Sequence, residues 1–156
     1  MSQLDRYGTA GEPPASAHAL EPFVHEEEVR HYLDVYARAV TNGDVRGVSA
    51  MWAVPSLVLG DYGAQAVTDL LQIQTLFAGA KEHYAAHGIV DTRPDIQSIQ
   101  WLTPHIVVAD VRWPLFDADH HERGVEYSTY TLERDGGGEL KMRVAVMRGE
   151  IAIEAH

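Results

Sequence analysis

The hydrophobic pattern changes its period along the chain, and this change constrains the fold more than any other feature of the sequence. Residues 22–42 and 68–88 carry apolar side chains at the spacing of amphipathic helices, whereas residues 95–151 alternate with the period of two that is typical of strands. Helices that precede a run of strands predict an α+β fold. We therefore expect a curved antiparallel sheet that is packed against about three helices and encloses a pocket.

The first helix is expected from Pro22 to Asn42. Proline suits the first helical turn, and the Asn42-Gly43 pair is a typical end signal. A short helix is expected from about Val45 to Trp52, followed by a brief strand over residues 57–61. The first helical stripe consists of Val29, Tyr32, Leu33, Tyr36, Ala37 and Val40.

A second long helix is expected from Thr68, as N-cap, to Gly88. Its stripe consists of Leu70, Ile73, Phe77, Ala80 and Tyr84. The closing strands are expected at residues 95–103, 106–116, 122–134 and 140–151, with a hairpin turn at residues 135–138.

These patterns predict one domain, residues 22–151, preceded by a flexible N-terminal arm (residues 1–21) and followed by a short tail (residues 152–156). The formal net charge of −11 disfavours binding to nucleic acid or to anionic membrane surfaces. No apolar run approaches the roughly 20 residues that span a bilayer, and the N-terminus lacks the pattern of a secretory signal. The chain has no cysteine, which suits a cytoplasmic location and excludes disulfides.

Two segments resemble a known family. Residues 32–63, with the Asn42-Gly43-Asp44 turn, and residues 106–142, with Tyr130, Leu132 and Arg134 on one strand, look like the nuclear transport factor 2-like superfamily, in particular its SnoaL-like (polyketide cyclase-like) branch. The resemblance implies a cone-shaped sheet capped by helices, that is, a cystatin-like α+β barrel, and a homodimer formed through the outer face of the sheet. It does not imply one activity, because a fold does not fix function.

Two candidate catalytic residues follow from this resemblance. Tyr36 matches the position at which the similar ketosteroid isomerases place an oxyanion-stabilising tyrosine, and a phenol in an apolar pocket can supply such a hydrogen bond. The alternative is a core tyrosine with a satisfied hydroxyl. Asp61 lies one residue from the expected position of the basic aspartate. Because a one-residue slip in a strand reverses the side chain, Tyr62 is the residue expected to face the pocket unless a bulge intervenes.

Asp110 and Arg112 share one face of a predicted strand, while Trp113 belongs to the other face. The acid and the guanidinium could activate water, as in the similar epoxide hydrolases, or form a charge pair on the outer face. His83 and His87 have a helical spacing that suits a metal. We nevertheless expect neither a metal nor a cofactor, because no complete ligand motif is present.

The favoured hypothesis is an apolar pocket that binds a small hydrophobic molecule. One alternative is a cofactor-independent acid–base enzyme, namely an isomerase, cyclase or dehydratase acting on a hydrophobic and even polycyclic substrate. Another is a dimeric interaction domain whose pocket is filled by side chains. The expected ligand-binding residues are Tyr36, Trp52, Tyr62, Phe77, Arg112 and Trp113.

Overall fold

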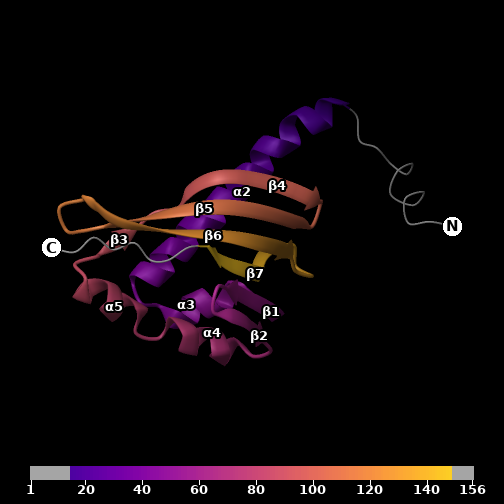
Figure 1. Cartoon of the computed structure of the whole chain (residues 1–156). Helices are drawn as coiled ribbons and strands as arrows, with labels where there is room; N and C mark the ends of the chain where they lie inside the picture. Colours follow the sequence, from indigo (N-terminus) through magenta and orange to yellow (C-terminus); the bar gives the residue numbers. More distant parts are fainter. Residues whose placement is uncertain (1–14, 149–156) are drawn as a thin grey trace.

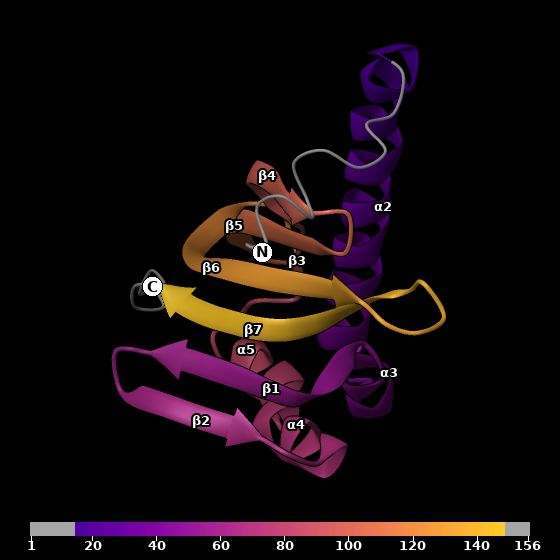
Figure 2. The same ribbon diagram turned by 90° about the vertical axis from the view of Figure 1, so that its right-hand side faces the viewer.

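The computed structural model describes the backbone of residues 15–148 and the side chains of residues 25–148. The predicted α+β fold is confirmed: the sheet is curved and open, and helices pack against it (Figures 1 and 2). The elements are α2 (Ala15–Thr41), α3 (Val45–Ala50), β1 (Trp52–Gly60), β2 (Gly63–Val67), α4 (Leu70–Phe77), α5 (Ala80–Ala86), β3 (Asp91–Thr92), β4 (Asp95–Thr103), β5 (Ile106–Phe116), β6 (Glu122–Arg134) and β7 (Leu140–Arg148).

The seven strands follow the order β2-β1-β7-β6-β5-β3, and β4 also pairs with β5. Figure 2 shows β2, β1, β7, β6 and β5 stacked in this order, with β4 beyond β5 and with α4 and α5 behind β1 and β2. Neighbouring strands run antiparallel except for β1 and β7, which are parallel. The first hairpin of the chain therefore joins the rest of the sheet through the last strand.

The long helix α2 extends past the sheet at its N-terminal end (Figure 1). It begins at Ala15, before the predicted start at Pro22, so residues 15–21 of the predicted arm have a helical backbone. The rest of that arm and the predicted tail lie outside the described residues. The helix ends at the predicted turn, where Gly43 has a φ of 70° and the Asp44 N–H donates to the Ala39 carbonyl over 2.9 Å.

The predicted second helix is instead two helices, α4 and α5, separated at residues 78–79. Gly79 there has a φ of 80°, a left-handed conformation that ends regular α-helix. The N-cap of α4 is Asp69 rather than Thr68, because the Asp69 carboxylate accepts from the Leu71 N–H and the Gln72 side chain completes a capping box. The short helix α3 ends at Ala50, and Trp52 already belongs to β1.

The predicted strands 95–103, 106–116 and 122–134 are observed as β4, β5 and β6, and β7 starts at the predicted residue 140. Strands β2 and β3 were not predicted. The register of β5 and β6 pairs Val107 with Leu132, and Trp113 with Glu126. Because side chains alternate across a strand, these residues share the inner face of the sheet.

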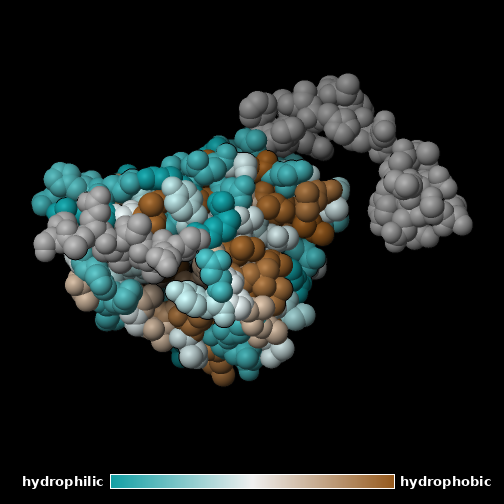
Figure 3. Space-filling view, viewed as in Figure 1, coloured by the Kyte–Doolittle hydropathy of each residue, from teal (hydrophilic) through white to brown (hydrophobic). Residues whose placement is uncertain are grey.

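The hydrophobic core lies between this inner face and the stripe of α2. Val29 and Leu33 on the helix are fully buried, as are Val107, Val111 and Leu132 on the strands. The packing explains why the stripe and the strand alternation were both visible in the sequence. None of the described helices combines the length and apolar character needed to span a bilayer. Figure 3 shows apolar residues gathered in the middle of one face of the molecule, among hydrophilic neighbours.

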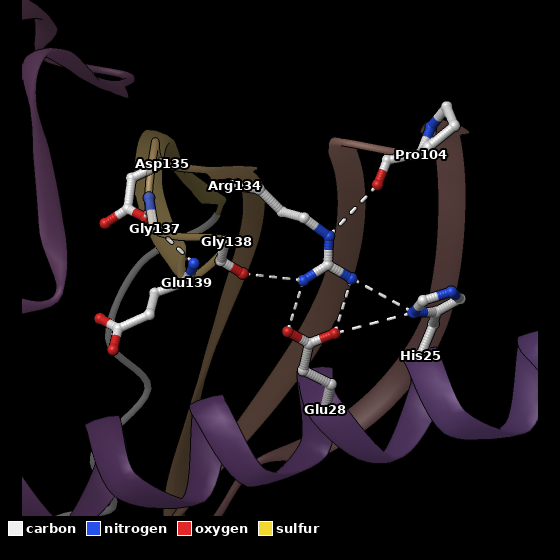
Figure 4. Close-up of polar contacts among 8 residues, drawn as sticks. All are labelled: His25, Glu28, Pro104, Arg134, Asp135, Gly137, Gly138 and Glu139. Atoms are coloured by element: carbon white, nitrogen blue, oxygen red, sulfur yellow. Dashed lines mark hydrogen bonds and ion pairs between the residues drawn. The ribbon is translucent and has the colours of Figure 1, made fainter.

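The Arg134 side chain links the end of β6 to helix α2 through hydrogen bonds (Figure 4). Its guanidinium donates to both oxygens of Glu28, over 2.6 and 2.7 Å, and to the carbonyls of Pro104 and Gly138, over 3.3 and 3.1 Å. It also lies over the Trp101 ring, 5.0 Å from the centroid. One side chain thus joins the opening helix to two turns at one end of the sheet.

Candidate functional site

A cavity of about 1350 Å³ lies between the inner face of the sheet and helices α2, α4 and α5. Its size is sufficient for an organic molecule. Aromatic residues from several elements line it, including Tyr36, Phe77, Tyr84, Trp113 and Tyr130, and so does the carboxyl group of Glu126 on β6. Of the predicted site residues, Tyr36, Phe77 and Trp113 are therefore brought together here.

Tyr36 lies on the inward stripe of α2 and is only 4% exposed. Trp52, at the start of β1, donates its indole N–H to the Tyr36 hydroxyl oxygen over 3.2 Å. Burial raises the pKa of Tyr36, and the nearby phenols of Tyr130 and Tyr32 raise it further. Tyr36 is therefore a neutral hydrogen-bond donor at ordinary pH. Trp52 supports it but does not line the cavity.

Tyr130 repeats this arrangement on β6. The indole N–H of Trp113 donates to its hydroxyl oxygen over 2.9 Å. Burial raises the pKa of Tyr130 to about 12, an effect partly offset by Ser128 and Trp113. The ring centroids of Tyr36 and Tyr130 lie 6.2 Å apart, so the two tyrosines are neighbours in the aromatic wall of the cavity.

The two indoles determine the direction in which the phenols can donate. An indole N–H is a donor only, so each phenol oxygen must be the acceptor in its contact with tryptophan. Neither the Tyr36 nor the Tyr130 hydroxyl donates a hydrogen bond of normal geometry to a described residue, although Ser128 lies close enough to the Tyr130 hydroxyl to offset part of the rise that burial causes in its pKa. The pair can therefore offer two O–H donors to an acceptor atom in the cavity.

Glu126 lies opposite Trp113 on the inner face of the sheet. The Tyr84 hydroxyl, from α5, donates a hydrogen bond to its carboxyl oxygen Oε1. Burial raises the pKa of Glu126, and the Tyr84 hydrogen bond and the charge of His83 only partly offset this effect. Burial also raises the pKa of Tyr84. The cavity thus holds a carboxyl group that is able to exchange a proton closer to neutral pH than an ordinary glutamate.

The sequence reasoning missed Glu126, although a signal for it existed. Glu126 is in phase with Ser128, Tyr130 and Leu132, all of which are buried along β6. A charged residue in phase with the buried side of a strand is a candidate for a functional site. Asp61, just after β1, was predicted instead from its position relative to the basic aspartate of the similar ketosteroid isomerases.

Asp61 and Tyr62 lie in the turn between β1 and β2, at the rim of the cavity. Both side chains are exposed, and Tyr62 is 99% exposed. The turn carries them toward solvent because β1 continues in register up to Gly60, opposite Gly63. The structure therefore does not place Asp61 beside Tyr36.

Asp110 and Arg112 lie on the outer face of the sheet and do not line the cavity. Arg112 binds Glu122 and approaches Asp95 to 3.7 Å. We therefore correct the expectation that Arg112 binds a ligand. Side chains alternate along β5, so Arg112 points to the outer face whereas its neighbour Trp113 points inward.

Hydroxyl groups on the same outer face donate hydrogen bonds to the Asp110 carboxylate. It accepts hydrogen bonds from Thr129 over 2.6 Å and from Ser98 over 2.9 Å. These bonds, that of Thr129 most of all, lower the pKa of Asp110 against the opposing effect of burial. Asp110 and Arg112 thus belong to separate polar networks rather than to a site that activates water.

Two groups of described residues carry side chains of the kind that bind metals. His83 and His87 are exposed on α5, and Nδ1 of His87 lies 3.0 Å from the His83 carbonyl oxygen. Asp117, Asp119 and His121 bring ligand atoms within 4.8 Å of one another. However, the Asp117 carboxylate already accepts from the backbone of this turn and from Arg123. The Asp117 oxygens are thus accounted for by the structure of the turn.

Comparison with known proteins agrees with this architecture. The family model described as NTF2-like protein (DUF6841) matches residues 26–150. No curated protein matches the chain.

Solved structures match over most of their length. An NTF2-like protein with a cystatin-like fold from Novosphingobium aromaticivorans has a TM-score of 0.63 at 14% identity, covering 88% of this chain and 90% of that one. A putative scytalone dehydratase from the same organism has a TM-score of 0.60 at 13% identity, covering 86% and 90%. A ketosteroid isomerase-like protein from Erwinia carotovora atroseptica has a TM-score of 0.52 at 10% identity, covering 74% and 90%. At these identities the likeness concerns the fold alone.

Proposed function

The chain belongs to the NTF2-like proteins of family DUF6841, and from this premise we propose that its cavity binds a small, largely apolar molecule. The observation that carries the proposal is the pair of available phenol O–H groups on Tyr36 and Tyr130, set in an aromatic wall. An apolar body would displace water from the wall, and an acceptor oxygen such as a carbonyl would receive the two donors. The proposed ligand is therefore apolar with at least one carbonyl-type oxygen.

A pair of probes of equal shape tests this function. 2-Acetylnaphthalene carries a carbonyl oxygen, and 2-isopropenylnaphthalene replaces it with a methylene group. Each neutral hydrogen bond contributes about 0.5–1.5 kcal/mol, so two bonds predict roughly tenfold or greater preference for the ketone. Binding is measured by titration, following the fluorescence of the probe itself.

Three variants make this experiment specific. Tyr36→Phe and Tyr130→Phe should each reduce the preference for the ketone, and together they should abolish it. Tyr62→Phe removes an exposed hydroxyl at the rim and should leave the preference unchanged. Binding of neither probe would refute the proposed function, and an unchanged preference in the double variant would refute the role of the phenols.

A second candidate is an acid–base enzyme without a cofactor, and the specific observation in its favour is Glu126. A carboxyl group with a raised pKa in the same cavity as two phenol donors could take a proton from the carbon beside a carbonyl that the phenols polarise. In this hypothesis the base is Glu126 and not Asp61. The expectation of a filled interaction domain is disfavoured by the cavity itself.

Proton abstraction can be detected without knowledge of the natural substrate. The ketone 2-tetralone has exchangeable protons next to its carbonyl, and its NMR signals decay as these protons exchange in D₂O. The enzyme reading predicts faster decay with the protein than with buffer, and loss of that acceleration in Glu126→Gln. Loss in Asp61→Asn, with Glu126→Gln still active, would restore Asp61 as the base.

A further inference from the structure

The charged groups that line the cavity are mostly acidic. Asp61, Asp91 and Glu126 line it, against a single cationic side chain, Lys81. The stem of Lys81 packs toward Gly43, where a Cβ added to the glycine would meet its Cδ at 3.2 Å. No described cation lies within ion-pair distance of Glu126. Glu126 therefore has no ion-pair partner among the described residues, although the charge of the nearby His83 offsets part of the rise that burial causes in its pKa.

Two other partly buried carboxylates of the described chain have cationic partners. Glu28 binds Arg134, and Glu133 binds Arg143, each at 2.6 Å. Glu126 accepts only the neutral Tyr84 hydroxyl, on one of its two oxygens. A carboxylate can accept about four hydrogen bonds, so the second oxygen has room for another donor.

Aromatic rings enclose the same space. Tyr36 meets Phe77 edge-on with centroids 6.2 Å apart, and Trp113 meets Tyr130 at 6.3 Å. The faces of such rings carry negative potential and attract cations, most strongly where water is excluded. A protonated amine near Glu126 would thus be stabilised by the ring of Trp113, which lies opposite Glu126 on the sheet, as well as by the carboxylate.

We propose that the cavity selects ligands that carry a protonated amine, with Glu126 as the counter-ion. This inference rests on the proposed function, because it assigns a second chemical group to the same ligand. The amine lies toward Glu126, and the acceptor oxygen lies toward Tyr36 and Tyr130. Glu126 and Tyr130 are four residues apart on one strand, so their Cα atoms are separated by about 13 Å. The net charge of −11 would favour the approach of a cation.

The test compares 2-(2-naphthyl)ethylamine with the neutral 2-(2-naphthyl)ethanol, using the full chain and calorimetric titration. We expect the amine to bind at least tenfold more tightly than the alcohol. Glu126→Gln should remove this preference by weakening the binding of the amine. Glu133→Gln is the matched control, because it makes the same chemical change on the same strand, outside the cavity, and should keep the preference.

A second measurement on the unmodified protein locates the amine directly. Nuclear Overhauser contacts should join the methylene group next to the nitrogen to Tyr84 and Glu126. Contacts only to residues outside the cavity, or equal affinity for amine and alcohol, would overturn the inference. If the alcohol and 2-acetylnaphthalene bind while the amine shows no preference, the proposed function stands and this inference fails. If none of the probes binds, both fail.

Discussion

The bond between Glu28 and Arg134 offers the sharpest test of how the fold is held together. Glu28→Gln replaces a charged acceptor by a neutral group of nearly the same shape and keeps one oxygen for Arg134. A hydrogen bond to a charged group contributes about 1.5–3 kcal/mol, whereas an exposed ion pair contributes about 0.2–1 kcal/mol. Arg134 is 15% exposed and Glu28 is 36% exposed, which places this pair between the two cases.

We therefore expect Glu28→Gln to lower the free energy of unfolding by about 1–2 kcal/mol at pH 7. Urea unfolding followed by circular dichroism measures this directly. With an m-value near 2 kcal/mol/M, the midpoint should fall by roughly 0.5–1 M. Glu139→Gln is the control, because Glu139 is 76% exposed and lies 3.7 Å from Lys141, so its loss should change stability by less than about 0.5 kcal/mol.

The pH dependence gives the same prediction an independent check. The hydrogen bond from Arg134 is the largest effect on the Glu28 carboxyl and lowers its pKa below the ordinary value of 4.5. A lowered pKa in the folded state stabilises the protein above the ordinary value, and this stabilisation is lost as the pH falls through the folded value. The difference between the original protein and Glu28→Gln should therefore shrink below about pH 4. A difference equal to that of Glu139→Gln at pH 7, or one that persists undiminished at pH 2, would refute the reasoning.

Three further outcomes are expected. Leu33→Ala removes a fully buried side chain and should lower the free energy of unfolding by about 2–5 kcal/mol in urea titration. Tyr84→Phe removes the hydroxyl that donates to Glu126 and should raise the pKa of that carboxyl further, as followed by carboxyl ¹³C NMR; a lowered pKa would contradict the hydrogen bond. Gly43→Ala places a Cβ at a φ of 70° and close to Lys81, so thermal unfolding should show destabilisation of about 1 kcal/mol.

The parts of the fold that sequence predicted are those in which one physical rule dominates. The stripe that includes Val29 and Leu33 is visible because one face of α2 meets the core, and β5 and β6 are visible because they alternate between core and solvent. The edge strand β2 was missed because its residues are mostly exposed, so its sequence lacks the alternation that a buried face produces. The break between α4 and α5 depends on the backbone of Gly79, which a stripe of side chains does not report.

The candidate site was predicted only in part, for a related reason. Tyr36 and Trp113 were identified because they belong to inward faces of well-predicted elements. Glu126 was overlooked because a hydrophobic pattern predicts that a charged residue is exposed. The alternation of side chains along β6 nevertheless places Glu126 on the inner face of the sheet. The contact between Glu126 and Tyr84 joins residues 42 positions apart, and only the packing of α5 over the sheet brings them together.

The parallel pairing of β1 with β7 has a consequence for the order in which the molecule can assemble. The hairpin of β1 and β2 is complete by residue 67, yet its other neighbour in the sheet is the strand at residues 140–148. An isolated two-stranded hairpin is marginally stable in water, so β1 gains lasting support only after almost the whole chain has been synthesised. Contacts between residues so distant in sequence also slow folding. During translation, the edge of β1 therefore stays unpaired and open to aggregation until β7 is available.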